Sequence, residues 1–165
     1  MEKNSLKYQT YVEILKRELV PAMGCTEPIA LAYCAAKARE VLGELPKRIE
    51  VEASGNIIKN VKSVVVPNTG GQRGIEAAVG IGILAGDAKR ELEVLSSVSQ
   101  EEKEQLPGYL SQVKIQVEPA QSGYLLDIQV RVYGEESEAS VRIAGKHTNI
   151  VRIEKNGEVL LDRCM

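Results

Sequence analysis

The sequence has 165 residues, of which 44% are hydrophobic and 27% charged, a balance typical of a folded globular protein and not of a disordered chain. Its 21 basic and 23 acidic residues are spread along the chain without a basic block, so nucleic acid is not an expected partner. No apolar run approaches the roughly 20 residues that span a bilayer, and we expect a cytoplasmic protein without a membrane segment.

Two helices are predicted in the first part of the chain. Apolar residues recur at helical spacing over residues 5–19, and an alanine-rich helix is predicted from Thr26 to Leu42, ending before Gly43. A half-buried strand is expected over residues 47–53, where charged and apolar side chains alternate, and another strand over residues 61–66.

A glycine-interrupted helix is predicted from Ile75 to Leu84. Gly80 and Gly82 lie inside it, where each glycine costs roughly 1 kcal/mol relative to alanine. We therefore expect another element to approach this helix closely.

The last part of the chain alternates between strand and helix patterns. A polar helix opened by S-Q-E-E is expected between two strands, and an N-G turn is expected to close a hairpin near the end. The predicted elements are strands over residues 91–98, 113–118, 124–133, 136–143 and 150–154, and a helix over residues 99–111.

Together these elements predict the α+β class. A helical N-terminal segment with a small mixed sheet is expected over residues 1–87, followed by an α+β sandwich lobe over residues 88–165. A single compact domain that contains both parts is the alternative.

The three cysteines are an odd number without disulfide-framework spacing, which favours a reducing compartment. Cys25 lies in a tight turn directly before a helix, where the helix dipole and unpaired N–H groups favour the thiolate, a nucleophile or an iron ligand. The alternative for Cys25 is a small apolar plug in a turn. Cys34 is expected in the core among apolar helix residues, and Cys164 in a frayed tail.

Two loops concentrate small hydrogen-bond donors and a cation. The first is S-G-N-I-I-K-N, residues 54–60, and the second is P-N-T-G-G-Q-R-G, residues 67–74, which precedes a helix. Glycine-rich turns at helix N-termini bind anions, and Arg73 can hold a carboxylate with two hydrogen bonds, which suits an amino acid. The alternative is that both are surface turns.

His147 is the only histidine of the sequence and lies in a loop between two predicted strands. A histidine there can carry a proton near neutral pH. The alternative is a solvated side chain without a role.

Four motifs follow one another along the chain: G-C-T-E-P at residues 24–28, S-G-N-I-I-K-N at 54–60, V-P-N-T-G-G-Q-R-G at 66–74 and G-K-H-T-N-I at 145–150. Together they resemble the L-cysteine desulfidase family, relatives of the iron-sulfur L-serine dehydratases. The resemblance implies a lyase that removes sulfide or water from a small amino-acid substrate to give pyruvate and ammonia. It also implies a 4Fe-4S cluster with Cys25 as one ligand.

Members of that family are much longer, and their other cluster cysteines lie in a helical C-terminal half that is missing here. This chain alone is therefore expected to be inactive, with the site completed by the missing half or by a second subunit; a homo-oligomer is left open. The general base is expected among Glu27, Lys59 and His147. The substrate is expected to contact Thr26, Ser54, Gly55, Asn56, Asn60, Thr69, Gly70 and Arg73.

Two other functions fit the same residues. The first is a non-catalytic module that binds a small amino acid through the two anion-holding loops. The second is a structural lobe that exposes an apolar patch to a partner.

Overall fold

The structure, a computed structural model, describes residues 26–163. All of its helices lie before the second strand, and five of its six strands follow one another after the last helix, which is the segregated order of the α+β class and confirms the predicted fold class. The elements are helices α2 (Thr26–Leu42), α3 (Gly55–Val61), α4 (Gly74–Ala85) and α5 (Gln100–Gln112), the 3-10 helix η1 (Ala88–Glu93), and strands β1 (Arg48–Ala53), β2 (Lys114–Pro119), β3 (Asp127–Tyr133), β4 (Glu138–Ala144), β5 (Ile150–Lys155) and β6 (Glu158–Asp162).

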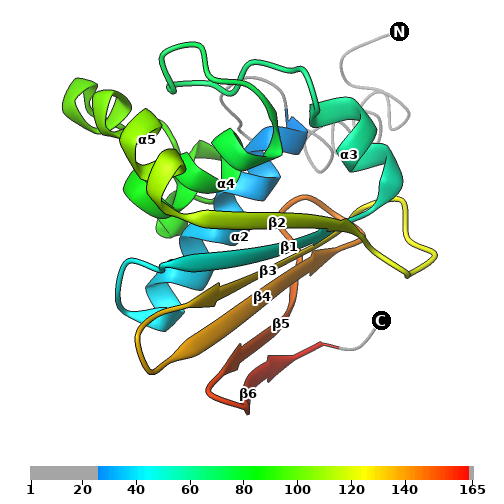
Figure 1. The fold of residues 1–165 in the computed structure, drawn as a ribbon. Helices are drawn as coiled ribbons and strands as arrows, with labels where there is room; N and C mark the ends of the chain where they lie inside the picture. The colour runs from blue at the N-terminus through cyan, green and yellow to red at the C-terminus, as the bar shows by residue number, and fades with distance from the viewer. Residues whose placement is uncertain (1–25, 164–165) are drawn as a thin grey trace, which may run out of the picture.

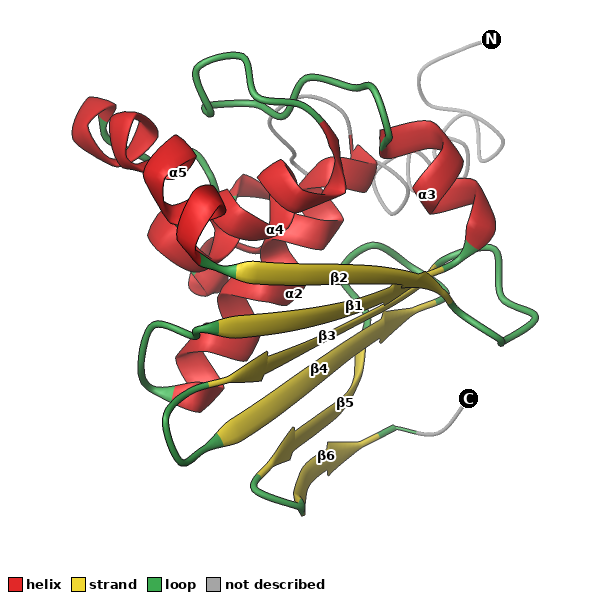
Figure 2. Cartoon of the chain, in the orientation of Figure 1, coloured by secondary structure: helices red, strands yellow, loops and turns green. Residues whose placement is uncertain are grey.

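The six strands form one mixed sheet in the order β2-β1-β3-β4-β5-β6, with α2, α4 and α5 on one of its faces (Figures 1 and 2). β1 is parallel to β2 and antiparallel to β3, and the remaining neighbours are antiparallel. Because β1 lies between β2 and β3, the two predicted parts of the chain contribute strands to the same sheet. The division at residue 87 stays a prediction.

Several elements were predicted correctly because local signals mark their ends. Gly43 follows α2 with a φ of +86°, and its N–H donates to the Arg39 carbonyl at 2.8 Å. The Ser99 and Glu102 side chains form a capping box that begins α5. The hairpin turn at Asn156 and Gly157 joins β5 to β6, and both residues have positive φ angles of 51° and 82°.

Three segments were predicted wrongly. The strand expected over residues 61–66 is a turn with one isolated bridge, and residues 54–60, expected as a loop, contain most of α3. Ile57 and Val61 explain that helix, since they lie four residues apart and both are buried. The strand expected over residues 91–98 is η1 followed by turns. Its buried residues, Leu92, Val94, Leu95 and Val98, do not follow the strict alternation of a half-buried strand.

The predicted helix over residues 5–19 and the turn around Cys25 lie outside the described residues.

The helix layer is built on small residues. α2 is buried against β3 and β4, and α4 packs on α2. The backbone of Ala32 lies so close to Gly82 that a Cβ atom on Gly82 would lie 2.3 Å from the Ala32 carbonyl oxygen, which confirms the predicted close approach. A Cβ atom on Gly86 would likewise meet Ala36 at 3.0 Å. Because these contacts advance in the same direction along both helices, α2 and α4 are parallel and begin at the same end of the molecule.

Candidate functional site

Helix starts and loops meet at one end of the sheet. β1 ends at Ala53 and leads into α3, and β4 ends at Ala144 before a loop over residues 145–149. The pairings of Ala53 with Ile128 and of Ala144 with Asp127 place both connections at the same end. Since Glu27 in the first turn of α2 contacts α3, α2 begins there as well (Figure 1).

Three predicted residues are brought together at this end by three different elements. The side-chain amide of Asn60 in α3 donates to the Glu27 carboxylate, with 3.3 Å between Nδ2 and Oε1. His147, in the loop after β4, is close enough to Glu27 for the carboxylate charge to act on its pKa. We call Glu27, Asn60 and His147 the acid–base cluster.

The environment of His147 favours the neutral form of its imidazole. Partial burial of the imidazole lowers the pKa of His147 below its ordinary value of 6.5, and the Glu27 charge opposes this shift without reversing it. A neutral imidazole has an unprotonated ring nitrogen that can accept a proton. The cluster can therefore accept a proton at His147 and stabilise the resulting imidazolium through Glu27.

The other predicted residues of α2 and α3 lie around this cluster. Thr26 is the first residue of α2 and is partly exposed, while Gly55, Asn56 and Lys59 are exposed on α3. These four residues stay candidates for substrate contact or proton transfer.

Ser54 is buried, and its hydroxyl already has partners in the sheet. Oγ donates to the Leu125 carbonyl at 2.7 Å and accepts from the Asp127 N–H at 3.3 Å. The structure thus gives the Ser54 side chain a role inside the fold, and the chemistry proposed below does not use it.

The glycine-rich turn before α4 is largely closed on itself. The buried hydroxyl of Thr69 donates to the Val66 carbonyl at 2.7 Å and accepts from the Gln72 N–H at 3.1 Å. Gly70 has a φ of +72°, which explains the glycine there. Arg73 is exposed, and its Nη1 donates to the Ser63 carbonyl at 2.7 Å. Binding of a carboxylate by this turn stays a prediction.

Sequence reasoning missed Asp127 and Arg142, which form a bidentate ion pair at this end of the sheet. The Nε–Oδ1 and Nη2–Oδ2 distances are 2.9 and 2.8 Å, and the Asp127 side chain is only 5% exposed. In the sequence each residue lies in an alternating strand at a position where a solvated charge is usual, so no local signal marks the pair.

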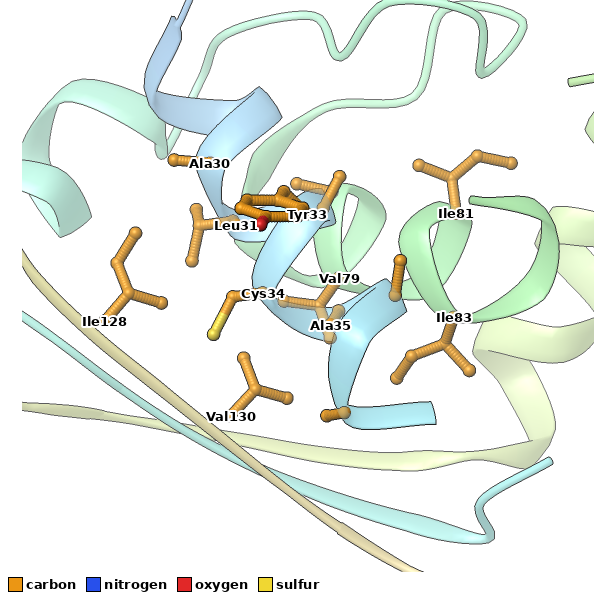
Figure 3. Packing of buried hydrophobic residues seen from close by; sticks show 14 of the residues in the cluster. Ala30, Leu31, Tyr33, Cys34, Ala35, Val79, Ile81, Ile83, Ile128 and Val130 are labelled. Atoms are coloured by element: carbon orange, nitrogen blue, oxygen red, sulfur yellow. The ribbon is translucent and has the colours of Figure 1, made fainter. Parts of the chain in front are cut away.

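The described cysteine does not fit an iron site. Figure 3 shows the Cys34 side chain directed from α2 towards the sheet beside Val130, and its thiol donates to the Val141 carbonyl at 3.2 Å. Burial raises the pKa of the Cys34 thiol far above its usual range, so the thiolate that iron requires is disfavoured. This confirms Cys34 as a core residue.

Residues 26–163 contain no group of three or more His, Cys, Asp or Glu side chains that could hold a metal ion. Cys25 and Cys164 lie outside this range. The described residues therefore do not by themselves fit a 4Fe-4S cluster, and no chemical step below is assigned to one.

A hollow of about 370 Å³ lies at the opposite ends of α2 and α4 and is lined by Arg39, Glu40 and Asp87 among others. The Arg39 guanidinium donates to the carbonyls of Ile83 and Leu84 at 2.5 and 3.1 Å. Arg39 therefore provides hydrogen-bond donors for carbonyls in the last turn of α4, which have no partner within the helix. None of the predicted site residues lines this hollow.

Among residues 26–163, we find no helix with the length and apolar character needed to cross a membrane.

The chain is similar to longer proteins that share one name. No family model matches it. A UPF0597 protein of Desulfitobacterium hafniense is 56% identical over 160 residues, which cover 97% of this chain and 37% of that relative. UPF0597 proteins of Finegoldia magna and Treponema denticola are 49% and 42% identical, covering 94% and 99% of this chain and 38% of each relative. The chain thus spans well under half the length of these relatives.

These relatives overturn the resemblance drawn from the four motifs. They match nearly the whole chain as UPF0597 proteins, and none of the three is named as an L-cysteine desulfidase or an L-serine dehydratase. That family assignment was wrong.

Proposed function

We propose that the acid–base cluster is the proton-transfer part of a site for a small polar amino acid. In the longer protein, we propose that this site serves a cytoplasmic lyase that acts on L-cysteine or L-serine. The observation that carries the proposal is the placement of His147, whose lowered pKa favours a neutral imidazole within range of the Glu27 charge. To abstract a proton, a base has to be unprotonated at the working pH, which requires a pKa near or below that pH.

The residues of the cluster have distinct roles in this proposal. His147 takes the Cα proton, and the electrons of the C–H bond form a Cα–Cβ double bond as the Cβ–S or Cβ–O bond breaks. The leaving sulfide or hydroxide is protonated to hydrogen sulfide or water. The aminoacrylate then takes up water and releases ammonia, giving pyruvate.

Glu27 stabilises the imidazolium that forms on His147, because opposite charges in a partly buried site attract more strongly than in water. Asn60 holds one oxygen of Glu27 through its side-chain amide and so limits rotation of the carboxylate. The chain therefore supplies a base, a counter-charge and an orienting amide from three separate elements.

The 4Fe-4S cluster stays part of the proposal only through Cys25 and a contribution from outside the described residues. When bound, such a cluster would supply a Lewis acid for the leaving group. Further ligands would have to come from a region corresponding to the part of the longer relatives that this chain does not cover, or from a second subunit.

A second candidate is a non-catalytic module that binds a small amino acid. It is favoured by the observation that polar side chains, with Asn60 and Glu27 in contact, gather at one end of the sheet. In this case Glu27 would pair with the substrate ammonium, and no bond would break.

Anaerobic calorimetric titration of the chain with L-cysteine and L-serine tests the binding that both candidates require. Glu27→Gln should weaken binding, whereas Glu101→Gln, a matched change in the first turn of α5, should leave it unchanged. Absence of binding heat for both amino acids would contradict both candidates.

Pyruvate formation separates the two candidates. The longer Desulfitobacterium hafniense relative should form pyruvate from one of the two amino acids under anaerobic conditions if the lyase proposal is right. Binding without pyruvate in that protein would favour the non-catalytic module.

A further inference from the structure

Asp127 occupies an unusual position for a carboxylate. Its side chain is 5% exposed, and Arg142 of β4 binds both of its oxygens. The Ser122 hydroxyl also donates to Oδ2. A buried carboxylate is tolerated when it is paired and hydrogen-bonded in this way, and removal of one partner is costly.

The backbone of Asp127 is tied to the start of α3. The Ser54 N–H donates to the Asp127 carbonyl at 2.9 Å, and the Asp127 N–H donates to the Ser54 hydroxyl at 3.3 Å. A serine at an N-cap usually directs its hydroxyl to its own helix, yet Ser54 makes no such bond to α3. The Ser54 hydroxyl instead fixes α3 to β3.

The neighbouring residue, Leu126, is tied to the loop that carries His147. Its carbonyl accepts from the Gly145 N–H at 3.0 Å. The same loop is closed at its base, where the Asn149 side chain and the Ala144 carbonyl are 2.9 Å apart. Residues 125–127 therefore contact both α3 and the loop over residues 145–149.

We propose that Asp127, paired with Arg142, is a positioning residue that sets the places of α3 and the 145–149 loop, so that Asn60 contacts Glu27 and His147 lies within range of the Glu27 charge. Arg142 lies on β4, three residues before that loop begins. The ion pair therefore links β4, which leads into the loop, to Asp127 of β3, whose backbone binds Ser54 at the start of α3. The proposal rests on the proposed function, because the acid–base cluster is what this pair positions.

Another ion pair on the same sheet provides a control. Arg152 and Glu154 lie 2.6 Å apart on β5, and Ser140 donates to Glu154 at 3.3 Å. This pair is also partly buried, but no hydrogen bond of Glu154 among the described residues reaches α3 or the 145–149 loop. Glu154→Gln should therefore perturb the sheet without displacing the cluster.

The test is the imidazole resonance of His147 in the ligand-free chain. Because the sequence contains one histidine, its carbon-bound ring protons give an unambiguous signal in a proton–carbon correlation spectrum. The spectra of Asp127→Asn, Ser54→Ala and Glu154→Gln are compared with that of the wild type at one fixed pH, together with their melting temperatures. Ser54→Ala keeps the ion pair and removes the hydroxyl that accepts from the Asp127 N–H, so it tests the link from Asp127 to the start of α3 even if Asp127→Asn does not fold.

We expect Asp127→Asn and Ser54→Ala to shift the His147 resonance, and Glu154→Gln to leave it at the wild-type position. A lower melting temperature with an unchanged His147 resonance in Ser54→Ala and in any folded Asp127→Asn would overturn the proposal, because it would show a purely structural role. Addition of L-serine to the wild type reports separately on the proposed function. If L-serine does not shift the His147 resonance, amino-acid binding is contradicted. The positioning proposal is still decided by the spectra of the ligand-free variants.

Discussion

Replacement of Gly82 by alanine tests the close packing of α2 and α4, which places both helix starts at the site end. A Cβ atom on Gly82 would lie 2.3 Å from the carbonyl oxygen, 2.7 Å from the Cα and 2.9 Å from the carbonyl carbon of Ala32. These are backbone atoms, which cannot rotate away, so the helices must separate. Overpacking of this kind costs about 1–3 kcal/mol, and the contact with backbone favours the upper part of that range.

The gain in helix propensity from glycine to alanine returns roughly 1 kcal/mol, which leaves a net loss of about 2 kcal/mol. For a protein of this size, such a loss lowers the melting temperature by roughly 4–8 °C. Thermal unfolding followed by circular dichroism measures the change.

Two other glycines serve as matched controls. A Cβ atom on Gly80 would meet the Leu110 Cδ2 atom at 2.6 Å, and this flexible side-chain end can rotate, so Gly80→Ala should cost much less. Gly108 in α5 has nothing within 4 Å of its Cβ position, so Gly108→Ala should stabilise the chain by about 0.5–1 kcal/mol. A Gly82→Ala variant that melts at or above the wild type, or no lower than Gly80→Ala, would refute the packing described here.

Three further predictions concern titrating and reactive side chains. Because the Glu27 charge raises the pKa of His147, Glu27→Gln should lower that pKa further in an NMR titration, and a rise would contradict the described electrostatics. The unfolded chain takes up a proton at His147 near pH 6.5 while the folded chain resists it, so stability should fall as the pH drops below 6.5. Chemical denaturation of His147→Gln should show a weaker fall, and an equal fall in both proteins would exclude His147 as a cause. In a Cys25→Ala, Cys164→Ala variant, Cys34 should resist iodoacetamide until denaturant is added, because its thiol is buried with a raised pKa; rapid alkylation of the native protein would contradict this.

Much of the fold was predictable because its signals are local. The end of α2 at Gly43 and the capping box of α5 each depend on residues within a few positions of one another. The segment over residues 91–98 was read as a strand because its apolar residues are dense, although its buried residues Leu92, Val94, Leu95 and Val98 do not alternate strictly as in a half-buried strand.

The candidate site was only partly predictable, because it depends on contacts between distant residues. Glu27, Asn60 and His147 were each selected from the sequence, but their meeting follows from the pairing of β1, β3 and β4. The Asp127–Arg142 pair joins residues on neighbouring strands, and a pair of this kind leaves no mark in either strand's pattern. Local motifs suggested an enzyme family that the relatives do not support.

The most direct test of the central claim is a titration of the wild-type chain with L-serine, followed through the His147 imidazole resonance. If the acid–base cluster binds a small amino acid, the resonance shifts and saturates as L-serine is added, and Asn60→Ala weakens the response. An unchanged resonance throughout the titration would contradict the claim that this end of the fold is an amino-acid site.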